Sequence, residues 1–127
     1  MYEKINFLYN MKYFNINEFD SPDVIGSGEI MNKEFLNMLD KARELADTPF
    51  KITSGVRSKA HNKKVGGVSN SSHILGYAAD VACNDSVSRF KILSALIKAG
   101  FNRIGIADTF IHIDNDPGKS ENVIWTY

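Results

Sequence analysis

Residues 70–80, NSSHILGYAAD, constrain the fold of this chain more than any other stretch. His73 carries an imidazole and Asp80 a carboxylate, and both are side chains that a zinc ion accepts as ligands. Two ligands do not complete a site, so a third must come from a remote part of the chain. His112, in the strand-like run TFIHIDND, is the comparable residue, since His61 lies in a lysine-rich polar stretch. The fold is therefore expected to bring His73, Asp80 and His112 together.

The ligand types also indicate what such a site would do. Two His and one Asp would leave a tetrahedral zinc ion with its fourth position open to water, which is typical of catalytic rather than structural zinc sites. Cys83 is the single cysteine, so intrachain disulfides and zinc modules built from four thiolates are excluded. The sequence thus predicts one zinc ion as cofactor.

Length and charge limit the remaining possibilities. A chain of 127 residues is expected to form one domain, residues 13–127, with residues 1–12 as a possible N-terminal extension. Fifteen basic residues balance fifteen acidic ones, which gives no reason to expect a nucleic acid or an anionic membrane as partner. We expect a monomer. The N-terminal residues lack the continuous apolar run of a signal peptide, so no export signal is expected.

Two segments have the apolar periodicity of helices. Residues 31–46 place apolar side chains at helical spacing, with charges on the other face. A second helix is expected over residues 86–99, with Phe90, Leu93 and Ile97 on its inner stripe.

Strands are expected around the candidate ligands. Residues 76–83 should form the strand that carries Asp80 inward, and residues 103–107 and 109–114 a tight hairpin. Side chains alternate along a strand, so His112 and Asp114 should share one face and the neighbouring isoleucines the other. With a short strand near residue 52 and an edge strand at the C-terminal end, the predicted fold is α+β, an antiparallel sheet whose other side two main helices cover.

Six short motifs follow one another in an order that resembles a known family. They are E-F-x-x-P at residues 18–22, S-G-x-R-S at 54–58, V-G-G at 65–67, S-x-H-x-x-G-x-A-x-D at 71–80, R-I-G-I at 103–106 and F-I-H-I-D at 110–114. Together they resemble the zinc D-Ala-D-Ala carboxypeptidase family of peptidoglycan peptidases, which shares its fold with the hedgehog signalling domain. The likeness is greatest to the small single-domain forms of bacteriophages and runs from about residue 13 to residue 125.

The resemblance implies a role for each site residue. His73, Asp80 and His112 would bind zinc, and Arg57 would anchor a carboxylate or carbonyl of the substrate. A guanidinium fork suits a peptide carboxylate better than a lysine does. Ser71, two residues before the first ligand, would orient the substrate or the metal loop.

The general base is the point where the sequence departs from the family. Members often place Glu, Asp or His two to four residues before the last ligand, and these positions are Asp108, Thr109 and Phe110 here. Asp108 falls in the expected hairpin turn, where Asp is common for conformational reasons. Asp114 shares the face of His112, so we expect it to act either as base or as support for that ligand.

The implied function is zinc-assisted hydrolysis of a peptide bond in peptidoglycan stem or cross-link peptides. Whether the enzyme is a carboxypeptidase or an endopeptidase stays open. The alternative is a non-catalytic, zinc-stabilised domain that binds the cell wall or a protein. The expected lack of an export signal fits a phage-type product made in the host cytoplasm and acting on the cell wall.

Overall fold

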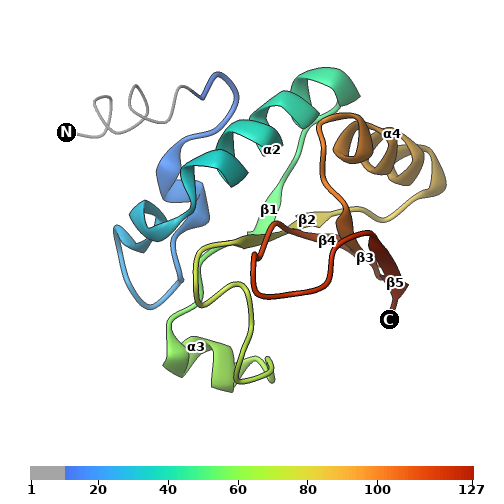
Figure 1. Ribbon diagram of the computed structural model, residues 1–127. Helices are drawn as coiled ribbons and strands as arrows, with labels where there is room; N and C mark the ends of the chain where they lie inside the picture. Colours follow the sequence, from blue (N-terminus) through green and yellow to red (C-terminus); the bar gives the residue numbers. More distant parts are fainter. Residues whose placement is uncertain (1–10) are drawn as a thin grey trace.

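The computed structural model describes residues 11–127, so most of the expected N-terminal extension lies outside the described residues. Five strands form one sheet in the order β1-β2-β4-β3-β5, and the two longest helices, α2 and α4, pack side by side against it (Figure 1). Within this part of the chain, no helix has both the length and the apolarity needed to cross a membrane. In chain order the elements are η1 (Ile16–Phe19), η2 (Ser27–Ile30), α2 (Lys33–Ala46), β1 (Ile52–Ser54), α3 (Lys59–Lys64), β2 (Ala78–Ala82), α4 (Ser86–Lys98), β3 (Arg103–Ile106), β4 (Phe110–Asp114) and β5 (Val123–Thr126).

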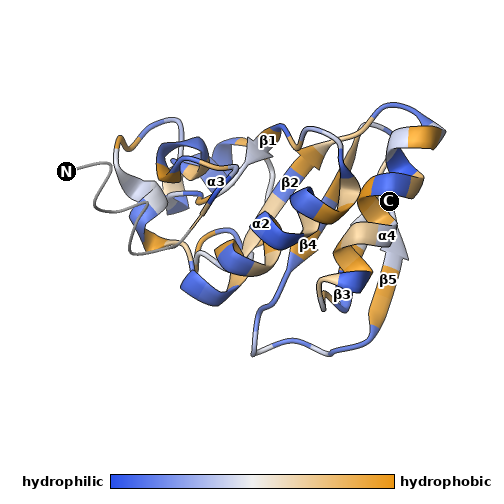
Figure 2. Cartoon of the chain, turned by 90° about the horizontal axis from the view of Figure 1, so that it is seen from above, coloured by the Kyte–Doolittle hydropathy of each residue, from blue (hydrophilic) through white to orange (hydrophobic). Residues whose placement is uncertain are grey.

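The central strands of the sheet are antiparallel, as predicted. β2 pairs with β4, and β4 forms a hairpin with β3. Along β4 the side chains alternate, so that Ile111 and Ile113 are fully buried in the core beneath the helices while His112 faces the other side. Figure 2 shows the hydrophobic strands β2 and β4 lying below α2 and α4. The predicted α+β fold is confirmed.

The edge strand β5 departs from the expected antiparallel arrangement, because it runs parallel to β3. Ile104 of β3 pairs with Ile113 near the end of β4, so β4 ends beside the first residues of β3. The connection from Asn115 to Asn122 stays at these strand ends and brings the chain beside the start of β3. A strand that starts there must run in the direction of β3.

Two polar side chains, one at the N-terminal end of helix α2 and one within it, accept hydrogen bonds from backbone N–H groups. Its N-cap residue, Asn32, accepts a hydrogen bond from the backbone N–H of Phe35 at 2.9 Å. The buried carboxylate of Asp40 accepts the backbone N–H groups of Lys12 at 2.9 Å and Tyr13 at 2.8 Å. These bonds hold the first described residues against the helix that covers the sheet.

The inner face predicted for α4 is wrong. Phe90 is 74% exposed and Ile97 50% exposed, whereas Ile92 and Leu96 are buried and Leu93 lies partly buried between the two stripes. Apolar residues occur on most sides of this helix, so periodicity alone does not select the buried stripe. Packing against α2 and the sheet turns Ile92 and Leu96 inward.

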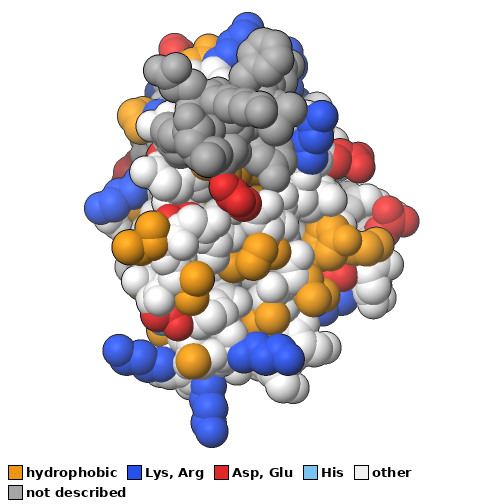
Figure 3. All heavy atoms as spheres, turned by 90° about the vertical axis from the view of Figure 1, so that its left-hand side faces the viewer, with side chains coloured by type: hydrophobic (Ala, Val, Ile, Leu, Met, Phe, Trp, Pro, Cys, Tyr) orange, Lys and Arg blue, Asp and Glu red, His pale blue; other side chains and the backbone are white. Residues whose placement is uncertain are grey.

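Positive charge gathers at the short helix α3. Lys59, Lys63 and Lys64 are exposed there, on the opposite side of the sheet from α2 and α4 in Figure 1. Figure 3 shows lysine and arginine side chains projecting at the lower end of the molecule, the end at which α3 lies in Figure 1. On the described part of that face above this end, hydrophobic side chains occur in small groups.

Candidate metal centre

Three buried side chains converge on the face of the sheet opposite the long helices. Asp80 and His112 are direct partners across β2 and β4, so their side chains point to the same face. His73 reaches them from the loop before β2. One ligand atom of each residue lies within 4.8 Å of the other two, so the structure brings together the three residues expected from the sequence.

The loop that carries His73 is held by backbone contacts. The carbonyl of His73 accepts the N–H of Arg57 at 3.1 Å, and the N–H of His73 donates to the hydroxyl of Ser71 at 3.2 Å. Gly76 has a φ of +79°, and a Cβ there would lie 2.5 Å from the carbonyl oxygen of Ile30. Only glycine therefore lets this loop turn and approach Ile30, at the end of η2, so closely.

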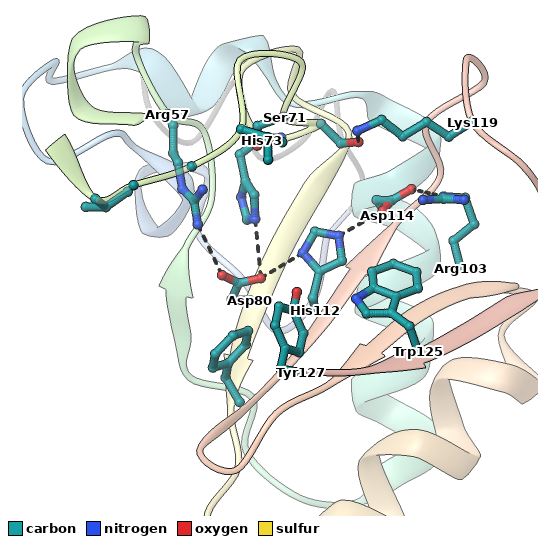
Figure 4. Close-up of a pocket in the computed structure, with 16 residues that line it drawn as sticks. Arg57, Ser71, His73, Asp80, Arg103, His112, Asp114, Lys119, Trp125 and Tyr127 are labelled. Atoms are coloured by element: carbon teal, nitrogen blue, oxygen red, sulfur yellow. Dashed lines mark hydrogen bonds and ion pairs between the residues drawn. The ribbon is translucent and has the colours of Figure 1, made fainter. Parts of the chain in front are cut away.

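The outer nitrogen of each imidazole has a partner that orients the ring, and Figure 4 draws the partner of His112, Asp114. Nδ1 of His73 lies 2.8 Å from the carbonyl oxygen of Gly55, which can only accept, so Nδ1 carries the proton. Nε2 of His112 lies 2.8 Å from Oδ2 of Asp114. The inner nitrogens, Nε2 of His73 and Nδ1 of His112, lie 3.3 Å and 2.9 Å from Oδ1 of Asp80. Outer partners of this kind are typical of histidines that ligate metals.

This donor set fits a metal ion. With the outer nitrogens protonated, the inner nitrogens turn their lone pairs toward the same carboxylate oxygen, and a cation between them removes the repulsion. Two imidazole nitrogens and one carboxylate oxygen are ligands that zinc accepts. The number of protein ligands leaves a coordination position for water or substrate.

When no metal is bound, a proton on His112 can supply positive charge beside Asp80. Burial raises the pKa of Asp80, but hydrogen bonds from His112 and His73 outweigh burial and hold that pKa well below its usual range. Burial lowers the pKa of His112, but its bonds to Asp114 and Asp80 outweigh burial and raise it above 6.5. The cluster therefore favours an ionised carboxylate beside a positive charge.

Asp114 has partners on both carboxylate oxygens. Oδ2 faces Nε2 of His112, whereas Oδ1 accepts hydrogen bonds from Nε of Arg103 at 2.6 Å and from the backbone N–H of Asp116 at 3.2 Å. Burial raises its pKa, but the bonds from His112 and Arg103 outweigh burial and lower it. Asp114 thus contacts His112 on the nitrogen that points away from Asp80, which is the contact a supporting role requires.

Asp108 lies away from this cluster. It is exposed in the turn between β3 and β4, and its backbone carbonyl accepts a hydrogen bond from Arg89 of α4 at 3.4 Å. Its side chain does not line the cavity over the three converging residues.

Arg57 and Ser71 both line that cavity, which has a volume of about 370 Å³. The guanidinium of Arg57 donates to the hydroxyl of Ser54 at 3.0 Å and to the side-chain oxygen of Asn62 at 3.2 Å. Its Nη2 lies 3.4 Å from Oδ2 of Asp80. Arg57 is therefore held beside the converging ligands with its fork toward the cavity (Figure 4).

Comparison with known families agrees with this geometry. The family model of Peptidase M15 matches residues 12–114, a span that contains Arg57 and the three converging residues. The chain belongs to the peptidase M15 family. The family implies a metallopeptidase with the hedgehog/DD-peptidase fold, as the sequence motifs suggested. No curated protein matches the chain.

Sequence reasoning assigned no role to Arg103 of β3 or to Tyr127, which follows β5, although both line the cavity of this M15 peptidase. Trp125 of β5, for which the sequence allows either a place beside the cleft or packing at the sheet edge, also lines the cavity. Period-two alternation was the available signal: Arg103 is two residues before Gly105, the cross-strand partner of His112, and Trp125 is two before Tyr127. That signal becomes useful only when the strand neighbours are known, since β5 is joined to the site through β3.

Proposed function

We propose that this protein is a zinc peptidase that hydrolyses a peptide bond in bacterial peptidoglycan, of the D-Ala-D-Ala type or in a cross-link peptide. The observation that carries the proposal is the buried convergence of His73, Asp80 and His112 at the floor of an open cavity in a peptidase M15 chain. The order of sequence motifs supports the substrate class, because it resembles the peptidoglycan peptidases of this fold.

The three converging residues would hold the ion through Nε2 of His73, Nδ1 of His112 and Oδ1 of Asp80. A zinc ion held there would supply a water of lowered pKa and would polarise the scissile carbonyl. Asp114 holds the imidazole of His112 in the ligating orientation through its Nε2 proton.

Arg57 binds the substrate in this proposal. Its guanidinium faces the cavity and is oriented by Ser54 and Asn62, so its fork is arranged before the substrate arrives. A bidentate contact suits the carboxylate of a peptide C-terminus, or a carbonyl beside the cleaved bond. Ser71 stabilises the loop of His73 by accepting its N–H.

The test uses the purified chain with purified peptidoglycan. Elemental analysis should find one zinc ion per wild-type chain and much less in His73→Ala and His112→Ala. Release of free alanine would indicate a carboxypeptidase, and new amino termini in the wall polymer would indicate an endopeptidase.

Two results would contradict the proposal in different ways. Zinc content unchanged in both variants would remove these histidines from the metal site. Zinc binding without any hydrolysis would support the alternative function, a zinc-stabilised domain that binds the wall or a protein.

A further inference from the structure

Trp125 and Tyr127 form one wall of the cavity over the converging residues. Both come from the C-terminal end of the described chain, outside residues 12–114, the span that the family model matches. In Figure 4 the phenol of Tyr127 stands beside Asp80 and His112, with its hydroxyl directed toward them. The proposed function above assigns no role to either side chain.

The position of this wall is fixed by the sheet. Trp125 pairs with Gly105 across β3 and β5, and the backbone N–H of Tyr127 donates to the carbonyl of Ile106 at 3.2 Å, which extends the pairing by one residue. The ring of Tyr127 lies 5.2 Å from that of Phe110, centre to centre. Two contacts, one of backbone and one of side chain, therefore orient the phenol.

Trp125 adds a third constraint on this wall. Its ring lies 5.5 Å from the ring of His112, and a Cβ on Gly105 would lie 2.5 Å from its Nε1, so the indole fits only because Gly105 has no side chain. A phenol O–H can donate one hydrogen bond, so Tyr127 can offer its proton to an acceptor in the cavity.

The phenol remains a donor at neutral pH. Burial raises the pKa of Tyr127, so the phenol keeps its proton. Of the other cations that line the cavity, Arg57 is assigned to the substrate in the proposed function, whereas Arg103 pairs with Asp114 and Lys119 with Asp116. Tyr127 is thus a neutral donor at the cavity wall beside the converging ligands.

We infer that Tyr127 is a catalytic residue of the proposed peptidase, whose phenol O–H donates a hydrogen bond to the scissile carbonyl oxygen as that oxygen gains negative charge. The role rests on the proposed function. The phenol keeps its proton throughout, so Tyr127 forms and breaks no covalent bond. Donors aimed at developing charge lower the barrier because the hydrogen bond strengthens in the transition state.

The test compares Tyr127→Phe with Tyr13→Phe, each of which removes one phenol hydroxyl from the full chain. Tyr13 is the matched control, because it is exposed, as Tyr127 is, and lies beside Arg43 of α2, away from the cavity. Tyr127→Phe should lower kcat by about 100-fold, the lower end of the effect of removing one such donor, with little change in KM. Zinc content and melting temperature should equal those of the wild type.

A binding measurement gives a second readout that does not depend on turnover. A phosphinate analogue of the cleaved peptide carries a tetrahedral, negatively charged group in place of the scissile carbonyl. Calorimetry should show that Tyr127→Phe weakens its affinity by about the same factor as kcat falls, since such analogues bind through transition-state contacts. The affinity for the product peptide should not change.

Three outcomes would overturn this role. Turnover equal to that of Tyr13→Phe would remove Tyr127 from the reaction, and a raised KM with unchanged kcat would indicate simple packing of substrate on the ring. Loss of zinc from Tyr127→Phe would indicate a structural role. A wild type that binds zinc but cleaves no peptide would overturn the proposed function itself. The first three outcomes differ from this one because the wild type is active in each of them.

Discussion

At the scale of single residues, Asp114 is distinguished from the other acidic groups of the site because both of its oxygens have partners. Arg103 and the backbone of Asp116 occupy Oδ1, and His112 occupies Oδ2. A carboxylate in this state orients an imidazole well and has little freedom to reach a water on the far side of the ring. The geometry thus favours the supporting role over proton transfer.

Asp114→Asn should therefore weaken zinc binding, by ~10 to 100-fold, the usual effect of removing a partner of a ligating histidine. The amide still accepts a bond from His112 but loses the charge that Arg103 neutralises at 2.6 Å. Competition with a chromophoric chelator measures the affinity. Asp108→Asn, in the exposed turn, is the control and should match the wild type. Full zinc affinity combined with lost turnover in Asp114→Asn would instead assign proton transfer to Asp114.

Arg57→Lys tests whether the planar fork matters beyond its charge. The variant should keep its zinc and its fold but lose about tenfold or more in kcat/KM, because a hydrogen bond to a charged group contributes about 1.5 to 3 kcal/mol. Arg89→Lys, on α4 and outside the cavity lining, is the matched control. Wild-type kinetics in Arg57→Lys would remove the guanidinium from substrate binding.

The convergence of His73, Asp80 and His112 could be predicted because their side chains are of metal-ligand type and the ordered motifs resemble a zinc peptidase family, although Asp80 and His112 meet only where β2 pairs with β4. The contacts of Arg103 and Trp125 could not, since each depends on which strands are neighbours. Arg103 reaches Asp114 only because β3 pairs with β4. Trp125 reaches His112 only because β5 follows β3 at the sheet edge.

At the scale of elements, helix α2 and the loop of His73 are connected through one residue. Asn32 caps α2 with its side chain, and its backbone N–H donates to the carbonyl of Gly76 at 2.8 Å. The side chain of Asn115, just beyond β4, also donates to the cap oxygen at 3.2 Å. The start of the helix is thus held both to the loop of His73 and to the segment that follows β4.

Asn32→Ala should lower the free energy of unfolding by about 1 kcal/mol, the usual effect of removing a side-chain N-cap. Urea unfolding measures this change. Asn37→Ala, at an exposed position within the same helix, is the matched control and should be neutral or slightly stabilising, because alanine is the better helix former. Equal losses in both variants would show that the cap contributes nothing beyond helix propensity.

Helices and the hairpin followed from the sequence because their signals are periodic and short in range. The positions of α2, α4 and the β3–β4 hairpin agree with the predictions to within a few residues. The buried stripe of α4 and the direction of β5 did not follow. Phe90 and Ile92 are both apolar, so only packing decides that Phe90 is exposed, and the path of the connection to β5 sets its direction.

At the scale of the whole molecule, the buried charges around His112 make the stability of the metal-free protein depend on pH. The pKa of His112 is raised above 6.5 in the folded state, so its contribution is complete below 6.5 and is lost as pH rises through the raised pKa. The pKa values of Asp80 and Asp114 are lowered from 3.8, so their contributions are complete above 3.8 and are lost as pH falls through the lowered pKa values. Together these groups favour weakly acidic conditions.

Zinc should reverse this dependence, because metal binding requires unprotonated imidazole nitrogens. Urea unfolding of the chelator-treated chain should give a larger free energy of unfolding near about pH 5.5 than near about pH 8.5. Added zinc should stabilise the protein more at the higher pH, since fewer protons compete with the metal there. His61→Gln, which alters a histidine outside the cluster, should keep both trends, and His112→Gln should lose them. A chelator-treated wild type that is equally stable at both pH values would show that His112 carries no proton between its two carboxylates.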